Sequence, residues 1–161
     1  MEQRRTISCE AIADAVARLC VQANTLLPAQ VRGLLCKACA AEPYAPAKET
    51  LELIRHNADI ARDQAMPICQ DTGMAVVYAE VGQDAHIVGG LLEDAVNEGV
   101  RRGYTNGYLR KSVVRDPIRR GNTGDNTPAV LHIRLTAGDR LKLTVAPKGF
   151  GSENMSRLCM L

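Results

Sequence analysis

The spacing of the apolar residues changes at Pro67, and this change constrains the fold more than any other feature of the sequence. In residues 1–65 apolar side chains recur at helical intervals, as in Ile12, Val16 and Cys20. After Pro67 they form short runs of strand composition, the first at 74–81. The sequence therefore predicts an α+β fold, with a helical amino-terminal region packed on a mostly antiparallel sheet.

Prolines and glycines divide the helical pattern into separate helices. A second helix opens at Pro28 and a third follows Pro46, because proline is tolerated in the first turn of a helix. Leu34 is expected to face inward from the second helix. A fourth helix begins after Gly90, and Gly103 can terminate it.

A β-hairpin is predicted near the carboxyl end. Apolar and polar residues alternate in 131–135 and again in 141–145, and Gly138 lies in the short connection between them. No internal repeat or linker interrupts the chain. We therefore expect residues 1–161 to form a single domain, with the helical leader 1–65 inside it.

Composition narrows the partners and the compartment. Lys and Arg number 20 against 18 Asp and Glu, so we expect no nucleic-acid partner. Residues 101–120 are basic and suit small anions, although a solvated charged face explains most of them. No apolar run approaches the roughly 20 residues of a membrane span, so we expect no membrane partner and a cytoplasmic location. The six cysteines are then expected as thiols or metal ligands rather than disulfides.

Cys69 differs from the other cysteines because it follows a proline and precedes the polar turn Gln70-Asp71-Thr72-Gly73. Such surroundings favour a metal-bound thiolate or a nucleophile beside a substrate-binding turn, and a merely structural turn is the alternative. A cysteine hydrolase would need a nearby histidine that the sequence does not supply. The triplet 71–73 also occurs in aspartic proteases, but there an apolar strand leads into it.

Two glycine-rich turns, 121–128 and 147–154, lie at the ends of the predicted hairpin strands. Glycines let backbone N–H groups approach an anion closely, so these turns are candidate anion-binding nests. Neither has the spacing of a nucleotide-binding loop. Cys36 and Cys39 lie within a helical pattern, where packing explains them better than a metal.

Four motifs together resemble one enzyme family. They are residues 69–73, 109–114, 122–129 and 148–154. In this order they are similar to the amino-terminal, alpha-type portion of class I iron–sulfur fumarate hydratases and L(+)-tartrate dehydratases. The resemblance implies a [4Fe–4S] hydro-lyase of the tricarboxylic acid cycle that adds water reversibly to fumarate to give (S)-malate. The open iron of such a cluster acts as a Lewis acid.

The resemblance also implies roles for individual residues. Cys69 would be a cluster ligand, Gln70 and Asp71 would bind the substrate, and Asp71 would take part in proton transfer as the catalytic residue. Arg110 would pair with a substrate carboxylate, which suits a planar guanidinium that can donate two parallel hydrogen bonds. Gly151 would offer its backbone to the same ligand.

The further cluster cysteines of the family have no counterpart here, and Cys159 does not match their context. This implies a family fold truncated at its carboxyl end, with a beta-type subunit or a missing carboxyl-terminal region completing the site. A homo- or hetero-oligomer acting on a small dicarboxylate is expected. The alternatives are a tartrate dehydratase alpha-type subunit, and a non-catalytic truncated remnant that retains an anion-binding fold.

Overall fold

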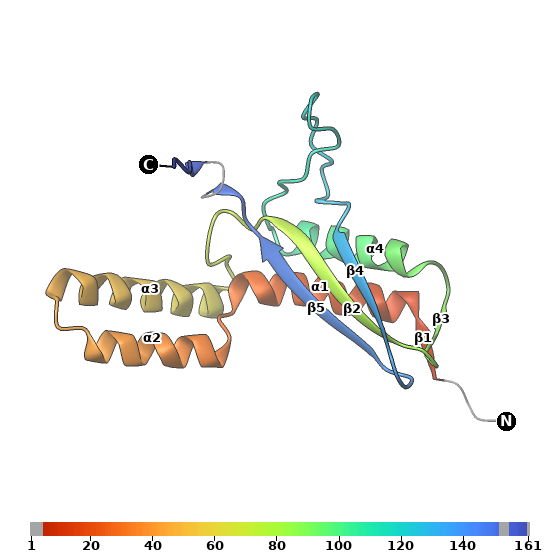
Figure 1. The fold of residues 1–161 in the computed structure, drawn as a ribbon, viewed down its shortest axis with the longest axis horizontal. Coiled ribbons are helices and arrows are strands. Elements are labelled where there is room, and N and C mark those ends of the chain that lie inside the picture. Colours follow the sequence, from red (N-terminus) through yellow and green to blue (C-terminus); the bar gives the residue numbers. More distant parts are fainter. Residues whose placement is uncertain (1–4, 152–154, 161) are drawn as a thin grey trace. The chain divides into compact units, whose positions relative to one another are not determined.

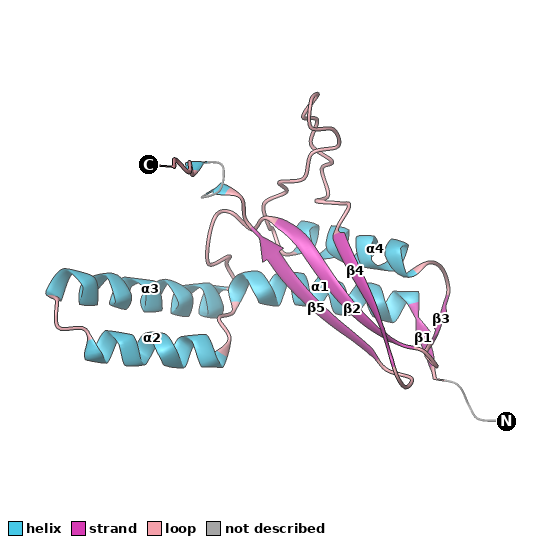
Figure 2. Ribbon diagram, viewed as in Figure 1, coloured by secondary structure: helices cyan, strands magenta, loops and turns pink. Residues whose placement is uncertain are grey.

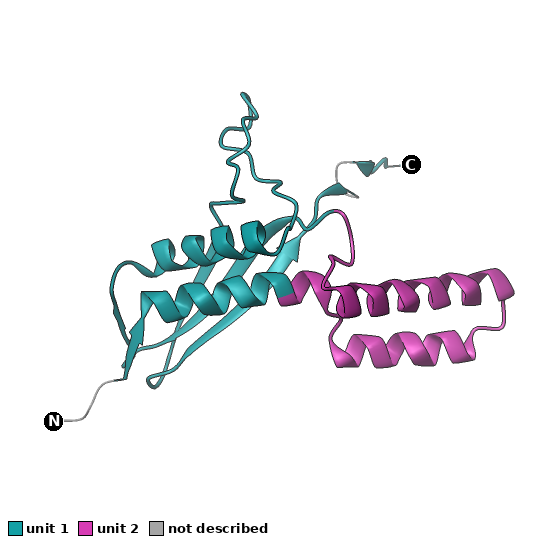
Figure 3. Ribbon diagram, turned by 180° about the vertical axis from the view of Figure 1, so that it is seen from behind, with its two compact units in different colours: residues 1–21, 71–161 teal, residues 22–70 magenta. Residues whose placement is uncertain are grey.

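The computed structural model describes residues 5–151 and 155–160 and divides the chain into two compact units. One consists of residues 22–70, and the other combines residues 1–21 with residues 71–161 (Figure 3). Each unit is described by itself below. The expectation of one domain over residues 1–161 stays a prediction.

The unit that contains residues 71–161 holds a mixed sheet and two helices. Its elements, in chain order, are β1 (Thr6–Ser8), α1 (Cys9–Thr25, shared at its end with the other unit), β2 (Met74–Gly82), β3 (His86–Val88), α4 (Leu92–Asn106), β4 (Val130–Thr136) and β5 (Leu141–Lys148). Helix α1 begins after Ser8, whose hydroxyl accepts the N–H of Ala11 at 3.2 Å, as an N-cap does. The predicted α+β class is confirmed (Figure 2).

Strand β2 lies at the centre of the three-stranded sheet, parallel to β4 and antiparallel to β5 (Figure 1). The short strands β1 and β3 form a separate parallel pair that the sequence did not predict. The predicted hairpin is therefore wrong in its pairing, although both of its strands exist. The sheet is mixed rather than mostly antiparallel.

The connection 137–140 explains how two sequential strands can flank a third. It passes across the end of β2, where Gly82 donates its N–H to the carbonyl of Arg140 at 2.7 Å. Gln83 donates to Thr136 at 2.9 Å. These hydrogen bonds attach the end of β2 to the connection 137–140. Strands β4 and β5 therefore lie on either side of β2 instead of pairing with each other.

Helices α1 and α4 pack on one face of this sheet. Figure 1 shows the sheet in front of α1, and Figure 3, seen from behind, shows both helices in front of the strands. The core is made by side chains of α1, β2 and α4 and of the chain just after α4: Ile12, Val16, Cys20, Ala75, Val77, Ala95, Val96, Val100, Tyr104 and Leu109. The two helices approach closely, because a Cβ added at Gly99 would lie 2.6 Å from the carbonyl oxygen of Ala13.

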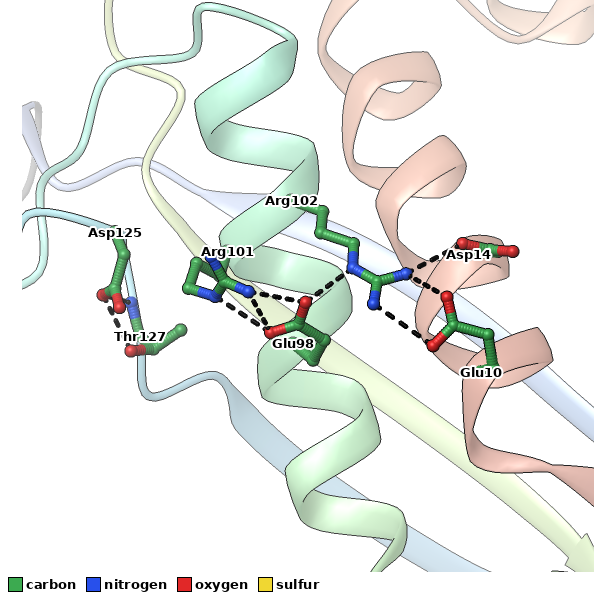
Figure 4. Close-up of polar contacts among 7 residues, drawn as sticks. All are labelled: Glu10, Asp14, Glu98, Arg101, Arg102, Asp125 and Thr127. Carbon is green, nitrogen blue, oxygen red and sulfur yellow. Dashed lines mark hydrogen bonds and ion pairs between the residues drawn. The ribbon is translucent and has the colours of Figure 1, made fainter. Parts of the chain in front are cut away.

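An exposed ion-pair network also joins α1 to α4 (Figure 4). The guanidinium of Arg102 binds Glu98 on its own helix and Glu10 on α1, each at 2.6 Å, and it reaches Asp14 at 3.1 Å. Hydrogen bonds that Arg102 donates to Glu10 and then to Glu98 raise the pKa of Arg102. Because these side chains are solvated, we expect the network to fix geometry more than it adds stability.

The unit of residues 22–70 is a pair of helices, α2 (Ala29–Ala41) and α3 (Ala45–Gln64). Helix α3 includes Pro46 in its first turn instead of following it, and it ends before Ala65, whose φ of 51° is left-handed. Cys39, Ala58 and Ala61 are buried in this unit. Leu34 is 60% exposed, so the expectation that it faces inward is wrong. No helix in the described residues is long and apolar enough to cross a bilayer.

Candidate functional site

The loop that carries Cys69 and Gln70 belongs to the unit of residues 22–70. Both side chains are exposed, and the Cys69 thiol lies 3.4 Å from Oε1 of Gln70. The loop is anchored at the preceding residue, because Ile68 donates its N–H to Asn24 at 2.8 Å. The side-chain amide of Asn57 donates to the carbonyl of Ile68 at 2.9 Å. The Cys69 thiol is therefore exposed on a loop whose backbone is held in place by hydrogen bonds.

Asp71 opens the other unit and lies at the centre of its polar network. One carboxylate oxygen accepts the N–H of Gly73 at 3.1 Å, and the other accepts the N–H groups of Phe150 at 3.1 Å and Gly151 at 3.3 Å. The Phe150 N–H is the largest cause of a lowered Asp71 pKa, and the Gly73 and Gly151 bonds and the Arg110 charge lower it further. Asp71 is therefore ionised at neutral pH.

Gly73 allows the turn of residues 71–73, here called the Asp71 turn, to lie against the end of β5. Its φ of 60° is in the left-handed region, and an added Cβ would lie 2.2 Å from the carbonyl oxygen of Lys148. Glycine is the residue that meets both requirements without strain. The close approach brings the Asp71 carboxylate onto the backbone that follows β5.

Arg110 lies in the segment 109–113, here called the Arg110 segment, which follows α4. Leu109 is buried in the core and Arg110 is exposed. The hydroxyl of Thr72 donates to the carbonyl of Arg110 at 3.0 Å, which ties the segment to the Asp71 turn. The Arg110 guanidinium is near enough to lower the pKa of Asp71. A cation and an ionised carboxylate therefore lie near each other.

Buried polar side chains that the sequence did not single out support this arrangement. Tyr104 of α4 donates its hydroxyl to the carbonyl of Thr72 at 2.8 Å. Asn126 is fully buried, accepts the N–H groups of Ser112 and Val113, and donates to the carbonyl of Gly73. The Asn-Thr-Pro run after Gly124-Asp125 was a usable signal, since asparagine tolerates the positive φ of 66° that Asn126 adopts.

The structure thus brings together three of the five predicted site residues. Asp71, Arg110 and Gly151 lie in one unit, whereas Cys69 and Gln70 lie in the other. The nest expected in 147–154 exists in part, because the N–H groups of residues 150 and 151 bind an anion. That anion is the side chain of Asp71. Residues 152–154 lie outside the described part of the chain.

The described residues do not fit a complete metal centre. Among them, no three His, Cys, Asp or Glu side chains are close enough together to hold an ion. A four-iron cluster is held by several cysteine thiolates. Cys69 therefore fits as one ligand of a cluster whose other ligands come from other residues. The three histidines, His56, His86 and His132, are exposed. The Cys39 thiol donates a hydrogen bond to Glu52 at 3.8 Å within its own unit.

Comparison with known proteins gives consistent relatives. The sequence model of the fumarate hydratase family matches residues 13–161. A protein of Methanocaldococcus jannaschii assigned as L(+)-tartrate dehydratase subunit alpha is 33% identical over 156 residues, 93% of this chain and 54% of that protein. The anaerobic class I fumarate hydratase of Escherichia coli is 36% identical over 110 residues, 67% of this chain and 20% of that protein. Fumarate hydratase 2 of Leishmania major is 36% identical over 104 residues, 63% of this chain and 18% of that protein. The chain spans about half the length of the first relative and about a fifth of the other two.

Proposed function

Because this chain belongs to the fumarate hydratase family, we propose that it forms part of a hydro-lyase site that binds a small dicarboxylate. The proposed reaction is the reversible addition of water to fumarate to give (S)-malate. One observation carries the proposal: the ionised Asp71, held by three backbone N–H groups, lies beside the exposed guanidinium of Arg110. A substrate with two carboxylates and a proton to exchange needs a fixed cation and a fixed anion of this kind.

In this proposal Arg110 binds a substrate carboxylate through two parallel N–H groups. Gly151 offers its N–H to the same ligand, and the role of Gln70 as a substrate ligand stays a prediction. The N–H of Gly151 now donates to Asp71 at 3.3 Å, so substrate and Asp71 compete for it. A substrate that captures this donor removes one cause of the low Asp71 pKa, and Asp71 becomes a stronger base for proton transfer.

The proposed cofactor is a [4Fe–4S] cluster with Cys69 as one ligand. Its other ligands come from a beta-type subunit or from a carboxyl-terminal region, in a homo- or hetero-oligomer. When bound, the cluster supplies a Lewis-acidic iron for the hydroxyl that is added or removed. The exposure of the Cys69 thiol supports this role, because a ligand shared with another polypeptide has to be accessible. A cytoplasmic location stays a prediction.

L(+)-tartrate is the second candidate substrate. The relative assigned as a tartrate dehydratase alpha subunit aligns with 93% of this chain, a larger share than the Escherichia coli and Leishmania major fumarate hydratases cover. Tartrate has the same two carboxylates as malate and one more hydroxyl, so Arg110 and Gly151 would serve both substrates.

The experiment reconstitutes the full chain anaerobically with iron and sulfide, alone and with a beta-type subunit co-expressed. Visible absorbance reports the cluster, and ultraviolet absorbance reports fumarate formed or consumed, with L(+)-tartrate assayed in parallel. Cluster and activity are expected in the complex. Absence of both activities from a complex that holds its cluster would overturn the proposal.

Matched variants test the individual roles in the same complex. Cys69→Ser is expected to prevent stable cluster assembly, whereas Cys159→Ser, another exposed cysteine, serves as its control. Arg110→Ala is expected to raise KM. Its control is Arg119→Ala, because Arg119 is an exposed arginine in the irregular chain between α4 and β4. Unchanged absorbance in Cys69→Ser, or an unchanged KM in Arg110→Ala, would remove that residue from the site.

A further inference from the structure

We propose that Asn126 is a positioning residue that holds the Asp71 turn and the Arg110 segment at a fixed separation. This inference rests on the proposed function for its catalytic meaning, but its geometry does not. Oδ1 of Asn126 accepts the N–H of Ser112 at 2.7 Å and that of Val113 at 3.2 Å. Its Nδ2 donates to the carbonyl of Gly73 at 3.1 Å. One side chain therefore joins both parts of the candidate site.

The chemistry at this position requires an amide. The Asn126 side chain is completely buried, so each backbone group that it binds would be left without a partner if the amide were removed. A carboxylate could accept the two N–H groups but would face the carbonyl oxygen of Gly73 without a proton to donate. Only a side chain with an acceptor and a donor satisfies all three backbone groups.

The segment that carries Asn126 is itself held in place. Asp125 accepts the N–H and the hydroxyl of Thr127, at 3.1 and 2.8 Å. Asn97, on α4, accepts the N–H of Ala129 at 2.9 Å. The backbone at Asn126 is therefore held in place, and its side-chain hydrogen bonds can fix the distance between the Asp71 turn and the Arg110 segment.

A second bridge runs alongside the first. The Thr72 hydroxyl donates to the carbonyl of Arg110, and the Tyr104 hydroxyl donates to the carbonyl of Thr72. Loss of Asn126 alone therefore leaves the turn and the segment connected. We expect the unit to stay folded while the turn loosens, so that Gly73 no longer holds its N–H against the Asp71 carboxylate and Arg110 moves relative to it.

The test measures amide hydrogen exchange by NMR in the full chain, at Gly73 of the Asp71 turn and at Ser112 of the Arg110 segment. Asn126→Ala is expected to speed exchange at both amides, because the turn and the segment lose the side chain that joins them. Asn106→Ala is the control, because Asn106 is an exposed asparagine at the end of α4. Exchange at Gly73 that is unchanged in Asn126→Ala overturns the inference.

Two further measurements keep the result decisive. If Asn126→Ala does not fold, Asn126→Ser retains an oxygen for one of the backbone N–H groups, and the same exchange measurement is made on it. In the reconstituted complex, Asn126→Ala is expected to raise KM about tenfold or more with a smaller change in kcat. Equal KM values in wild type and variant count against the positioning role. A complex that is inactive, in a chain whose Gly73 exchange responds as expected, overturns the proposed function and leaves the positioning role intact.

Discussion

The close contact between α1 and α4 predicts that Gly99→Ala destabilises the chain. The added methyl group would lie 2.6 Å from the carbonyl oxygen of Ala13 and 2.6 Å from Cβ of Val16. Neither atom can rotate away, so we place the overpacking cost near the upper end of its usual range, about 3 kcal/mol. Alanine recovers about 1 kcal/mol of helix propensity over glycine. The net loss is about 2 kcal/mol, which corresponds to a fall in Tm of roughly 4–8 °C.

Gly33→Ala is the matched control, because Gly33 lies in α2 and a Cβ there meets nothing within 4 Å. This variant gains the same propensity without the collision, so its stability is expected to rise by up to about 1 kcal/mol. Urea unfolding followed by circular dichroism gives the two changes, and amide hydrogen exchange assigns each to its unit. If Gly99→Ala gained as much as Gly33→Ala, the close approach of the two helices would be refuted.

Three other predictions follow from buried or charged groups. Tyr104→Phe leaves the buried carbonyl of Thr72 without its hydroxyl donor, so urea unfolding is expected to show a loss of about 1–3 kcal/mol, and an unchanged midpoint would contradict this. Burial raises the pKa of Cys20 to about 12, so iodoacetamide at pH 8 should modify the exposed Cys36 and spare Cys20 in native protein, as peptide mass spectrometry would report; equal labelling would show that Cys20 is accessible. The lowered pKa of Asp71 contributes stability that is present above the unfolded value of 3.8 and is lost as pH falls through the folded value. The difference in unfolding free energy between wild type and Asp71→Asn should therefore be largest near neutral pH and shrink below 3.8, and a difference independent of pH would show that the Asp71 bonds do not depend on its charge.

The positions of the strands in the sequence were easier to predict than the order in which the strands pair in the sheet. Alternation in 141–145 correctly assigns the face that packs on the core. In 131–135 it does so only at Leu131, because Ile133 and Leu135 are 57% and 71% exposed. Alternation carries no information about which strand lies next in the sheet. The short connection suggested a hairpin, but β2 fills the space between the two strands. The usable signal was Gly82, where an added Cβ would lie 2.4 Å from the carbonyl oxygen of Gly138.

The proximity of three predicted site residues could be anticipated from the sequence, but their hydrogen bonds could not, and their roles stay predictions. The motifs anticipated that Asp71, Arg110 and Gly151 lie near one another, and the structure brings them together. Which anion occupies the backbone N–H groups after β5 depends on how closely two distant segments pack, and a sequence pattern does not contain that distance. For the same reason Asn126 was overlooked, since its partners are backbone groups that no residue type identifies. The role of Cys69 as a ligand stays a prediction.

The central place of β2 has a consequence for how the chain is made. A ribosome delivers β2 well before β4 and β5, so the most apolar strand of the sheet leaves the exit tunnel with both hydrogen-bonding edges open. Those edges close only after Lys148 has emerged and the arch 137–140 has been drawn around the strand. Until then the open edges of β2 can pair with an exposed strand of another chain. We therefore expect the chain to aggregate most readily during its synthesis, and chaperones that bind the nascent chain to reduce this aggregation.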